Sequence, residues 1–285
     1  MITVGVDGSR AGLEAVGWAA REAVLREVPL TIVHAMPRWA CQSESEGGHY
    51  AEVGRWIRDG GRTVLAAAEE RAHREQPKIE VTTAFLPGDP RTALISAAED
   101  AELLVIGSHG LGCVRGLLVG SVAYGVAGHA ACDVVLVREL PSLPRGEVVV
   151  GVDGSPASRR VLDFAFAEAE LRGADLRAAH AWAWPQLGGF EPADPDSERN
   201  ELLVLKETLA GHRERHPDVT VVEEVVHGHP VEVLRQAATG ADLLVVGSHG
   251  HGTFAGLVIG SVSQAMLHQS PCPLAVVRRR QDSEA

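Results

Sequence analysis

Apolar positions along the chain fall into two kinds of segment. Short runs of Val, Leu and Ile predict β-strands, and longer amphipathic segments predict helices. In the first half we expect strands at 2–6, 30–35, 79–85, 103–106 and 134–137, and helices at 11–26, 54–75, 91–100 and 121–129. In the second half we expect strands near 147–152, 175–181, 219–226, 243–246 and 274–277. Alternating elements with apolar strands predict an α/β fold, a parallel sheet with helices on both faces.

Three local signals refine these helices. Ser9 is expected to cap the helix at 11–26, and Pro90 to open the one at 91–100. Gly60 and Gly61 weaken the prediction of the helix at 54–75, because glycine disfavours a helix interior.

The chain repeats itself. Residues 5–9 (Gly-Val-Asp-Gly-Ser) recur at 151–155, an offset of 146, and residues 107–110 (Gly-Ser-His-Gly) recur at 247–250, an offset of 140. The six extra residues of the first copy are expected in the irregular stretch 36–53. We therefore predict two similar domains at 1–138 and 147–279, a proline-containing linker at 139–146 and a tail at 280–285.

Each copy carries a glycine pattern after its fourth strand. A Gly-x-x-Gly segment follows the strand, and a Gly-Ser pair opens the next helix after nine intervening residues. These positions are Gly107, Gly110, Gly120 and Ser121 in the first copy, and Gly247, Gly250, Gly260 and Ser261 in the second. Backbone N–H groups of such a loop, with the start of a helix, attract a polyphosphate. The alternative is that these glycines serve only tight turns, which the exact repetition of the spacing disfavours.

This loop is not a Walker A motif. The chain has no Gly-Lys-Ser/Thr, and its two lysines, Lys78 and Lys206, lie elsewhere. Arg115 lies within the first loop, but its counterpart in the second is Ala255. Phosphates would therefore be held mostly by backbone groups, with a divalent ion, Mg²⁺ or Mn²⁺, to offset their charge; its ligands are unknown.

The motif G-x2-G-x9-G-S/T, together with Val-Asp-Gly-Ser after the first strand, resembles the universal stress protein family. It is similar to the tandem-domain, ATP-binding type found in actinobacteria. The resemblance covers nearly the whole chain and implies two Rossmann-like domains. Each would have a five-stranded parallel sheet of order 3-2-1-4-5.

The resemblance also implies a nucleotide site in each domain. Asp7 and Asp153 would bond the ribose or adenine side, Ala35 and Ala181 the adenine through their backbone, and Ile106 and Val246 would flank the ribose. The glycines and serines of the motif would hold the phosphates. The full set is Gly5, Asp7, Ala35, Ile106, Gly107, Gly110, Gly120, Ser121 and Val122, with Gly151, Asp153, Ala181, Val246, Gly247, Gly250, Gly260, Ser261 and Val262. For both aspartates a turn or capping role is the alternative, which is compatible with ligand contact.

Other repeated polar residues point to structure rather than chemistry. The histidine pairs His34/His180 and His109/His249 lack metal-ligand spacing, so we expect structural roles. Ser9 and Ser155 lack a nucleophile elbow, and we expect helix caps. No catalytic residue is predicted.

Aromatic, cysteine and loop residues complete the set. Trp182 and Trp184 either stack on the base or cover the pocket. Cys132 and Cys272 precede apolar strands, which favours buried packing. Arg278-Arg279-Arg280 is expected to be a solvated tail, and 41–50 and 186–198 are expected to be loops over the two pockets.

Charge and composition limit the classes of binding partner that we expect. A formal net charge of −12 argues against nucleic acid and against a polybasic membrane contact. No apolar run approaches the roughly 20 residues that a bilayer span needs. The four cysteines form no CxxC pair, and the N-terminal stretch lacks the features of a secretion signal, so we expect a cytoplasmic protein.

The resulting hypothesis is an ATP-binding sensor or regulator of the stress response. One alternative is a slow Mg²⁺-dependent ATPase or nucleotidyl-transferring enzyme, and another is a scaffold with structural ATP. The fifth strands, 134–137 and 274–277, are short apolar edges. We expect them to pair within one chain, and we expect a homodimer of such chains with four nucleotide sites.

Overall fold

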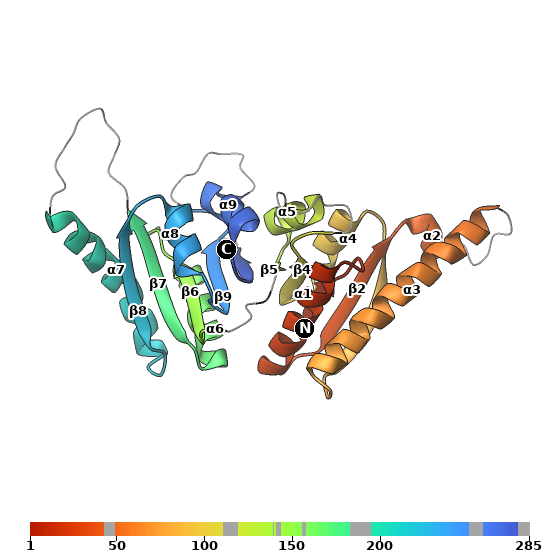
Figure 1. Cartoon of the computed structure of the whole chain (residues 1–285), viewed down its shortest axis with the longest axis horizontal. Helices are drawn as coiled ribbons and strands as arrows, with labels where there is room; N and C mark the ends of the chain where they lie inside the picture. Colours follow the sequence, from red (N-terminus) through yellow and green to blue (C-terminus); the bar gives the residue numbers. More distant parts are fainter. Residues whose placement is uncertain are drawn as a thin grey trace, which may run out of the picture. The chain divides into compact units, whose positions relative to one another are not determined.

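The fold is described from a computed structural model of the 285-residue chain. The structure describes residues 1–42, 49–110, 119–138, 140, 144–155, 158–182, 195–250 and 259–278. The chain divides into two compact units, Met1–Leu140 and Pro141–Ala285 (Figure 1). The finer boundaries expected from the repeat, with a linker at 139–146, stay a prediction.

The first unit alternates strands and helices. Its elements are β1 (Ile2–Gly5), α1 (Arg10–Leu25), β2 (Leu30–Met36), α2 (Arg38–Gln42), α3 (His49–Glu75), β3 (Val81–Pro87), α4 (Pro90–Ala97), β4 (Leu103–Gly107), α5 (Ser121–His129) and β5 (Asp133–Val137). The five strands are parallel and adjacent in the order β3-β2-β1-β4-β5. Helices cover both faces: α1 packs with α3, and α4 packs with α5.

The second unit repeats this arrangement. Its elements are β6 (Glu147–Gly151), α6 (Ser158–Arg172), β7 (Asp175–Trp182), α7 (Pro195–Arg215), β8 (Val221–His227), α8 (Pro230–Ala237), β9 (Leu243–Gly247), α9 (Ser261–Gln269) and β10 (Leu274–Val277). The strand order is β8-β7-β6-β9-β10, again parallel. The predicted fold class, two α/β domains with strand order 3-2-1-4-5, is confirmed.

Buried Val, Leu and Ile residues form the central strands of each sheet. Ile2 and Val4 of β1, and Leu103 to Val105 of β4, are fully buried. In β3 no residue is fully buried, as suits an edge strand. The apolar runs that predicted the strands are therefore the residues that form the core.

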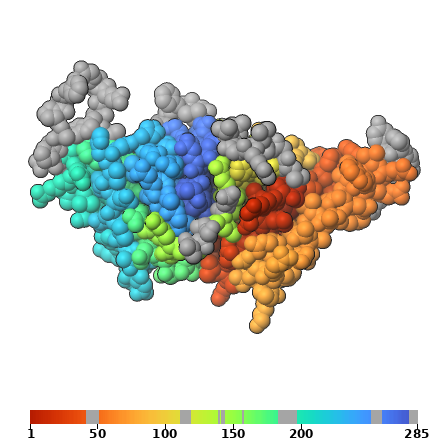
Figure 2. Space-filling model, in the orientation of Figure 1, coloured from red at the N-terminus to blue at the C-terminus, as the bar shows by residue number. Residues whose placement is uncertain are grey.

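Helix α3 is one continuous helix, although two glycines lie in its middle. A Cβ on Gly61 would lie 2.8 Å from a ring carbon of Phe85 and 3.0 Å from the terminal methyl of Met36. Gly61 thus lets α3 approach the sheet closely, while a Cβ on Gly60 would meet nothing within 4 Å. The outer side of α3 forms the orange surface of the first unit in Figure 2.

Several predicted boundaries were wrong. The third strand begins at Val81 rather than 79, and α2 lies within the stretch expected to be irregular. The expected loop 41–50 is helical at 41–42 and 49–50, and the loop 186–198 is helical from Pro195. The remaining positions of both loops lie outside the described residues.

Side-chain capping explains where some helices begin. Ser9 Oγ accepts the Gly12 N–H at 3.1 Å, which confirms Ser9 as the N-cap of α1. At α4, Asp89 accepts the N–H groups of Arg91 and Thr92 at 3.1 and 3.2 Å, and Pro90 occupies the first turn as predicted.

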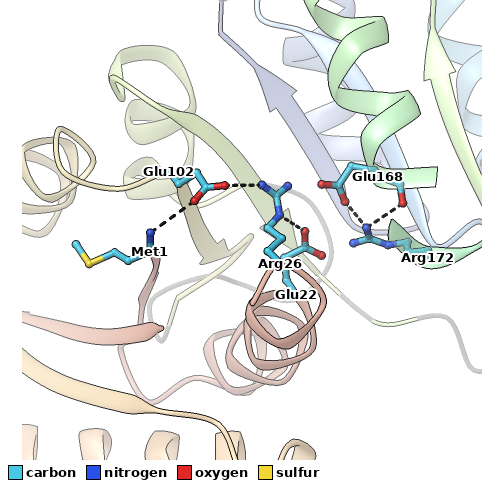
Figure 3. A network of polar contacts seen from close by, with 6 residues as sticks. All are labelled: Met1, Glu22, Arg26, Glu102, Glu168 and Arg172. Carbon is cyan, nitrogen blue, oxygen red and sulfur yellow. Dashed lines mark hydrogen bonds and ion pairs between the residues drawn. The ribbon is translucent and has the colours of Figure 1, made fainter. Parts of the chain in front are cut away.

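An ion-pair motif occurs at equivalent places in both units. Figure 3 shows Arg26 paired with Glu22 and Glu102, at 2.5 and 3.2 Å, and the Met1 amino group 3.6 Å from Glu102. In the second unit Arg172 pairs with Glu168, the residues that the offset of 146 relates to Arg26 and Glu22. The repeat therefore extends beyond the glycine motifs to a largely buried ion pair within each unit.

The cysteine expectation holds for one of two residues. Cys272 is buried, and its Sγ donates to the Pro273 carbonyl at 3.5 Å. Cys132 is half-buried, so the prediction of full burial was wrong there. Both cysteines lie in the short turn before the fifth strand of their unit, Cys132 between α5 and β5 and Cys272 between α9 and β10.

Candidate functional site

The first unit has a pocket of about 440 Å³ at the carboxyl ends of its central strands. All nine residues predicted from the sequence line it: Gly5, Asp7, Ala35, Ile106, Gly107, Gly110, Gly120, Ser121 and Val122. They come from the ends of β1, β2 and β4 and from the start of α5. A doubly wound sheet places ligands at this edge, where the order of the strands reverses.

The second unit has an equivalent pocket of about 280 Å³. It is lined by all nine counterparts: Gly151, Asp153, Ala181, Val246, Gly247, Gly250, Gly260, Ser261 and Val262. The structure thus brings each predicted set together within its own domain.

The aspartate after the first strand is fixed by the backbone around it. Asp7 Oδ1 accepts the Ser9 N–H at 3.0 Å, and Asp153 Oδ1 accepts the Ser155 N–H at 2.9 Å. The intervening glycines, Gly8 and Gly154, have φ of +85° and +75°. Each aspartate thus forms an Asx turn with a glycine of positive φ in its middle. The turn role considered for both aspartates is confirmed. It leaves both carboxylates lining their pockets.

The second glycine of each motif contacts this carboxylate. A Cβ on Gly110 would lie 2.5 Å from Asp7 Oδ2, and a Cβ on Gly250 would lie 2.4 Å from Asp153 Oδ2. No side chain fits at such a distance without displacing the carboxylate. The glycine is therefore required by the position of the aspartate as well as by any ligand.

The first glycine of each motif serves packing. A Cβ on Gly107 would lie 2.8 Å from backbone atoms of Ala11 and Gly12 in α1. A Cβ on Gly247 would lie 3.1 Å from the Val161 side chain and from the His249 carbonyl oxygen. Packing within the protein therefore favours glycine at Gly107 and Gly247, whatever ligand the loop binds.

A helix begins at each pocket without a side-chain cap. Gly120 is the N-cap of α5 and Gly260 that of α9, and neither helix has a side-chain capping bond. The two cap N–H groups donate back to the carbonyls of Ser108 and Ser248, at 3.0 and 2.7 Å. The first-turn residues of both helices line the pockets. Uncapped N–H groups and the positive end of the helix dipole favour an anion there.

The second-strand histidines have the structural role expected of them. His34 Nδ1 lies 2.8 Å from the Val6 carbonyl oxygen, and His180 Nδ1 lies 2.8 Å from that of Val152. Because a carbonyl only accepts, Nδ1 is the donor of this bond in both rings. These bonds tie the second strand to the end of the first, just before each aspartate.

His109 and His249, for which the sequence predicted structural roles, both line their pockets. Each ring lies beside the preceding serine hydroxyl, with Nδ1 to Oγ distances of 2.7 and 3.2 Å. The signal that pointed to them is their exact repetition inside the glycine motif.

Further lining residues were not predicted from the sequence. In the first pocket they are Val6, Gly12, Val33, His34, Pro90, Leu94 and Ala123. In the second they are Val152, Ser155, Ser158, Val161, Ala179, Pro230, Leu234 and Ser263. Most are apolar and come from neighbouring strands and from α4 or α8, so their contribution depends on the tertiary fold.

The remaining residues considered for ligand contact do not line the pockets or lie outside the described residues. Trp182 packs edge-on against His227, with ring centroids 4.8 Å apart, and is not among the residues that line the second pocket. Trp184, Arg115 and Ala255 lie outside the described residues. Over the described ranges, no group of three or more His, Cys, Asp or Glu is placed to hold a metal ion.

The comparisons with known proteins agree with the duplicated pockets. A model of the universal stress protein family matches residues 1–138 and again 145–278. The chain belongs to the universal stress protein family. Two universal stress proteins of Mycobacterium tuberculosis are 36% and 37% identical to it, over 98% and 97% of this chain and 97% and 96% of their own length.

Solved structures support the same family fold. The crystal structure of a universal stress protein from Archaeoglobus fulgidus matches with a TM-score of 0.72 and 20% identity, covering 98% of both chains. At that identity the likeness supports the fold alone. Within the described part of this universal stress protein, no helix has the length and apolarity to cross a membrane.

Proposed function

We propose that each domain binds one ATP molecule with a divalent cation, and that the chain acts as a nucleotide-dependent sensor or regulator of the stress response. The observation that carries this proposal is the composition of the two pockets. Each combines an apolar wall, a fixed carboxylate and the uncapped start of a helix. Those three parts match the base, the sugar and the phosphates of a nucleotide.

The apolar wall suits a purine. In the first pocket Val6 directly follows β1, and Val33 and Ile106 lie in the adjacent strands β2 and β4. Ala35 is the penultimate residue of β2. Small-molecule pockets are mostly apolar with a few fixed polar groups, and typically measure roughly 300–1,000 Å³. The first pocket lies within this range and the second just below it.

The polar groups suit the rest of the nucleotide. Asp7 and Asp153, as carboxylates, accept hydrogen bonds from donors such as ribose hydroxyls. The first turns of α5 and α9 offer N–H groups to phosphate oxygens. The choice of ATP among nucleotides rests on the glycine motif of the ATP-binding branch of the family, which both domains carry in full.

The divalent cation is assigned chiefly to the phosphates. Mg²⁺ keeps several waters and binds phosphate oxygens with one or two protein ligands. That mode fits pockets whose described surroundings contain no cluster of metal-ligating side chains. The hydroxyls of Ser121 and Ser261, at the helix starts, are the protein oxygens best placed to assist it.

The test is the nucleotide content of the purified protein. The chain is denatured, the supernatant is separated by anion exchange, and ATP is counted per chain. We expect close to two, and binding of two ATP when nucleotide-free protein is titrated with ATP and Mg²⁺. Absence of ATP from the purified protein together with absence of binding on titration would overturn the proposal.

The same samples separate the proposal from its rivals. Steady phosphate release that requires Mg²⁺ would favour a slow ATPase over a sensor. Nucleotide removal that lowers thermal stability without altering any protein interaction would favour a scaffold. We also propose that the chain forms a homodimer, for which light scattering should give twice the mass of 30.2 kDa.

A further inference from the structure

The two pockets differ at a position next to the pocket carboxylate. Gly12 lines the first pocket and Ser158 lines the second. The offset of 146 that relates Asp7 to Asp153 also relates Gly12 to Ser158. The same place in the two copies is therefore filled by a hydrogen atom in one and by a hydroxymethyl group in the other.

In the second domain this hydroxyl engages the pocket carboxylate. Ser158 Oγ donates to Asp153 Oδ1 at 2.7 Å, and the same oxygen accepts the Ser155 N–H at 2.9 Å. A carboxylate has a limited number of lone-pair positions. A hydrogen bond from Ser158 thus competes with a donor that a ligand brings to Oδ1 of Asp153.

In the first domain the corresponding groups are arranged differently. Gly12 has no side chain to offer, and its N–H donates to Ser9 Oγ at 3.1 Å. Ser9 Oγ in turn lies 3.3 Å from the His109 carbonyl oxygen, to which it donates. The serine hydroxyl next to Asp7 is therefore used within the protein, as a helix cap.

Ser155, the counterpart of Ser9 in the second domain, has a hydroxyl with different surroundings. Ser155 lines the second pocket, and its Oγ is enclosed without a hydrogen-bond partner among the residues the structure describes. A further hydroxyl of that pocket, on Ser263, donates to the Gly247 carbonyl. The two pockets thus share a backbone plan but differ in the bonds that their serine hydroxyls make.

We propose that Ser158 makes the two nucleotide sites unequal, so that the first domain binds ATP more tightly than the second. The inference rests on the proposed function. Ser158 engages the acceptor that a ribose hydroxyl or the adenine amine would use, and it adds atoms to a pocket of about 280 Å³ where the first has about 440 Å³. One hydrogen bond to a charged group corresponds to about a tenfold change in affinity, the difference expected here.

The test is calorimetric titration of the nucleotide-free full chain with ATP and Mg²⁺. The unmodified chain should show two classes of site, about tenfold apart in Kd. Ser158→Gly should tighten the weaker class and merge the two. Ser158→Ala, which keeps the Cβ but removes the hydroxyl, separates the loss of the hydrogen bond from the gain of space.

The reverse substitution tests the same idea in the first domain. A Cβ on Gly12 would lie 3.2 Å from Asp7 Oδ1 and 3.3 Å from Ser9 Oγ, so a serine there is crowded but within reach of the carboxylate. Gly12→Ser should weaken the tighter class about tenfold, while Gly12→Ala should weaken it less. If Gly12→Ser unfolds, the Ser158 variants carry the test alone.

Matched controls and outcomes complete the design. Gly60→Ala and Gly211→Ala place a Cβ in open space in helices away from the pockets and should leave both classes unchanged. A single class in the unmodified chain, or two classes that Ser158→Gly leaves in place, would overturn the inference while preserving the proposed function. Absence of any ATP binding would overturn both.

Discussion

Asp7 and Gly110 are in direct contact across the first pocket, with the carboxylate Oδ2 only 2.5 Å from where a Cβ on the glycine would lie. The two residues are 103 positions apart, yet neither position is free to change without the other. Asp153 and Gly250 stand in the same relation in the second domain, at 2.4 Å.

Gly110→Ala should abolish nucleotide binding in the first domain and leave the second domain intact. The added methyl displaces the Asp7 carboxylate, and overpacking of this kind costs about 1–3 kcal/mol of stability. The measurement is ATP per chain, which should fall from two to one. Gly250→Ala should give the same count from the other site, and the double variant should bind none. Retention of two ATP by Gly110→Ala would contradict this prediction.

Gly107→Ala should destabilise the protein more than Gly247→Ala. At Gly107 the new methyl meets backbone atoms of α1 at 2.8 Å, and backbone cannot rotate away. At Gly247 the neighbours are 3.1 Å away, and one of them is the Val161 side chain. We expect a loss of about 1–3 kcal/mol for the first variant and a smaller one for the second. Urea unfolding measures both, and equal losses would contradict the assigned cause.

His212 should make stability depend on pH in the mildly acidic range. The ring lies buried on α7, stacked on Phe166 with centroids 5.5 Å apart. Burial lowers the pKa of His212, and the Asp163 carboxylate, 3.2 Å from Nδ1, opposes that shift without cancelling it.

The sign of the effect follows from linkage. Because the folded state binds the proton less readily than the unfolded chain, the stabilising effect of the neutral ring is present above the ordinary histidine pKa of about 6.5. It is lost as the pH falls through the lower pKa of the folded state. As the pH falls from about 7.5 to about 5.5, the free energy of unfolding of His212→Phe should therefore decrease less than that of the unmodified chain. Urea unfolding at each pH measures this difference. His73→Gln, which removes an exposed histidine, should follow the unmodified chain.

Cys272 should resist alkylation in the folded protein. Burial raises the pKa of its thiol to about 12, and the side chain is 2% exposed. Only the thiolate reacts with iodoacetamide. Cys41 and Cys132, both half-buried, should be labelled first, as measured by peptide mass spectrometry. Labelling of Cys272 as fast as that of Cys132 in the absence of denaturant would contradict this.

The sequence predicted the fold because its apolar runs are the buried strands themselves. The repeat added a second test of every element, and the motif glycines located the edge of the sheet where the pockets lie. Local signals also sufficed at Ser9 and Pro90, where capping acts within one turn.

What escaped prediction depends on contacts between distant residues. Helix α2 begins where the Pro37 carbonyl accepts the N–H groups of Ala40 and Cys41, and the Arg58 guanidinium, from α3, donates to the Ala40 carbonyl at 2.5 Å. Likewise, nothing in the sequence around Gly107 indicates that this residue packs against α1. Such partners are set by tertiary packing, which periodicity does not record.

His34 and His180 anchor the chain just beyond the first strand of each domain. Each ring nitrogen is bonded to the carbonyl of Val6 or Val152, the residue immediately before the pocket aspartate. The start of each aspartate loop is thus held by a side chain on the neighbouring strand, outside the loop. Variation within the loop can alter what it contacts, but the point from which it departs is anchored elsewhere.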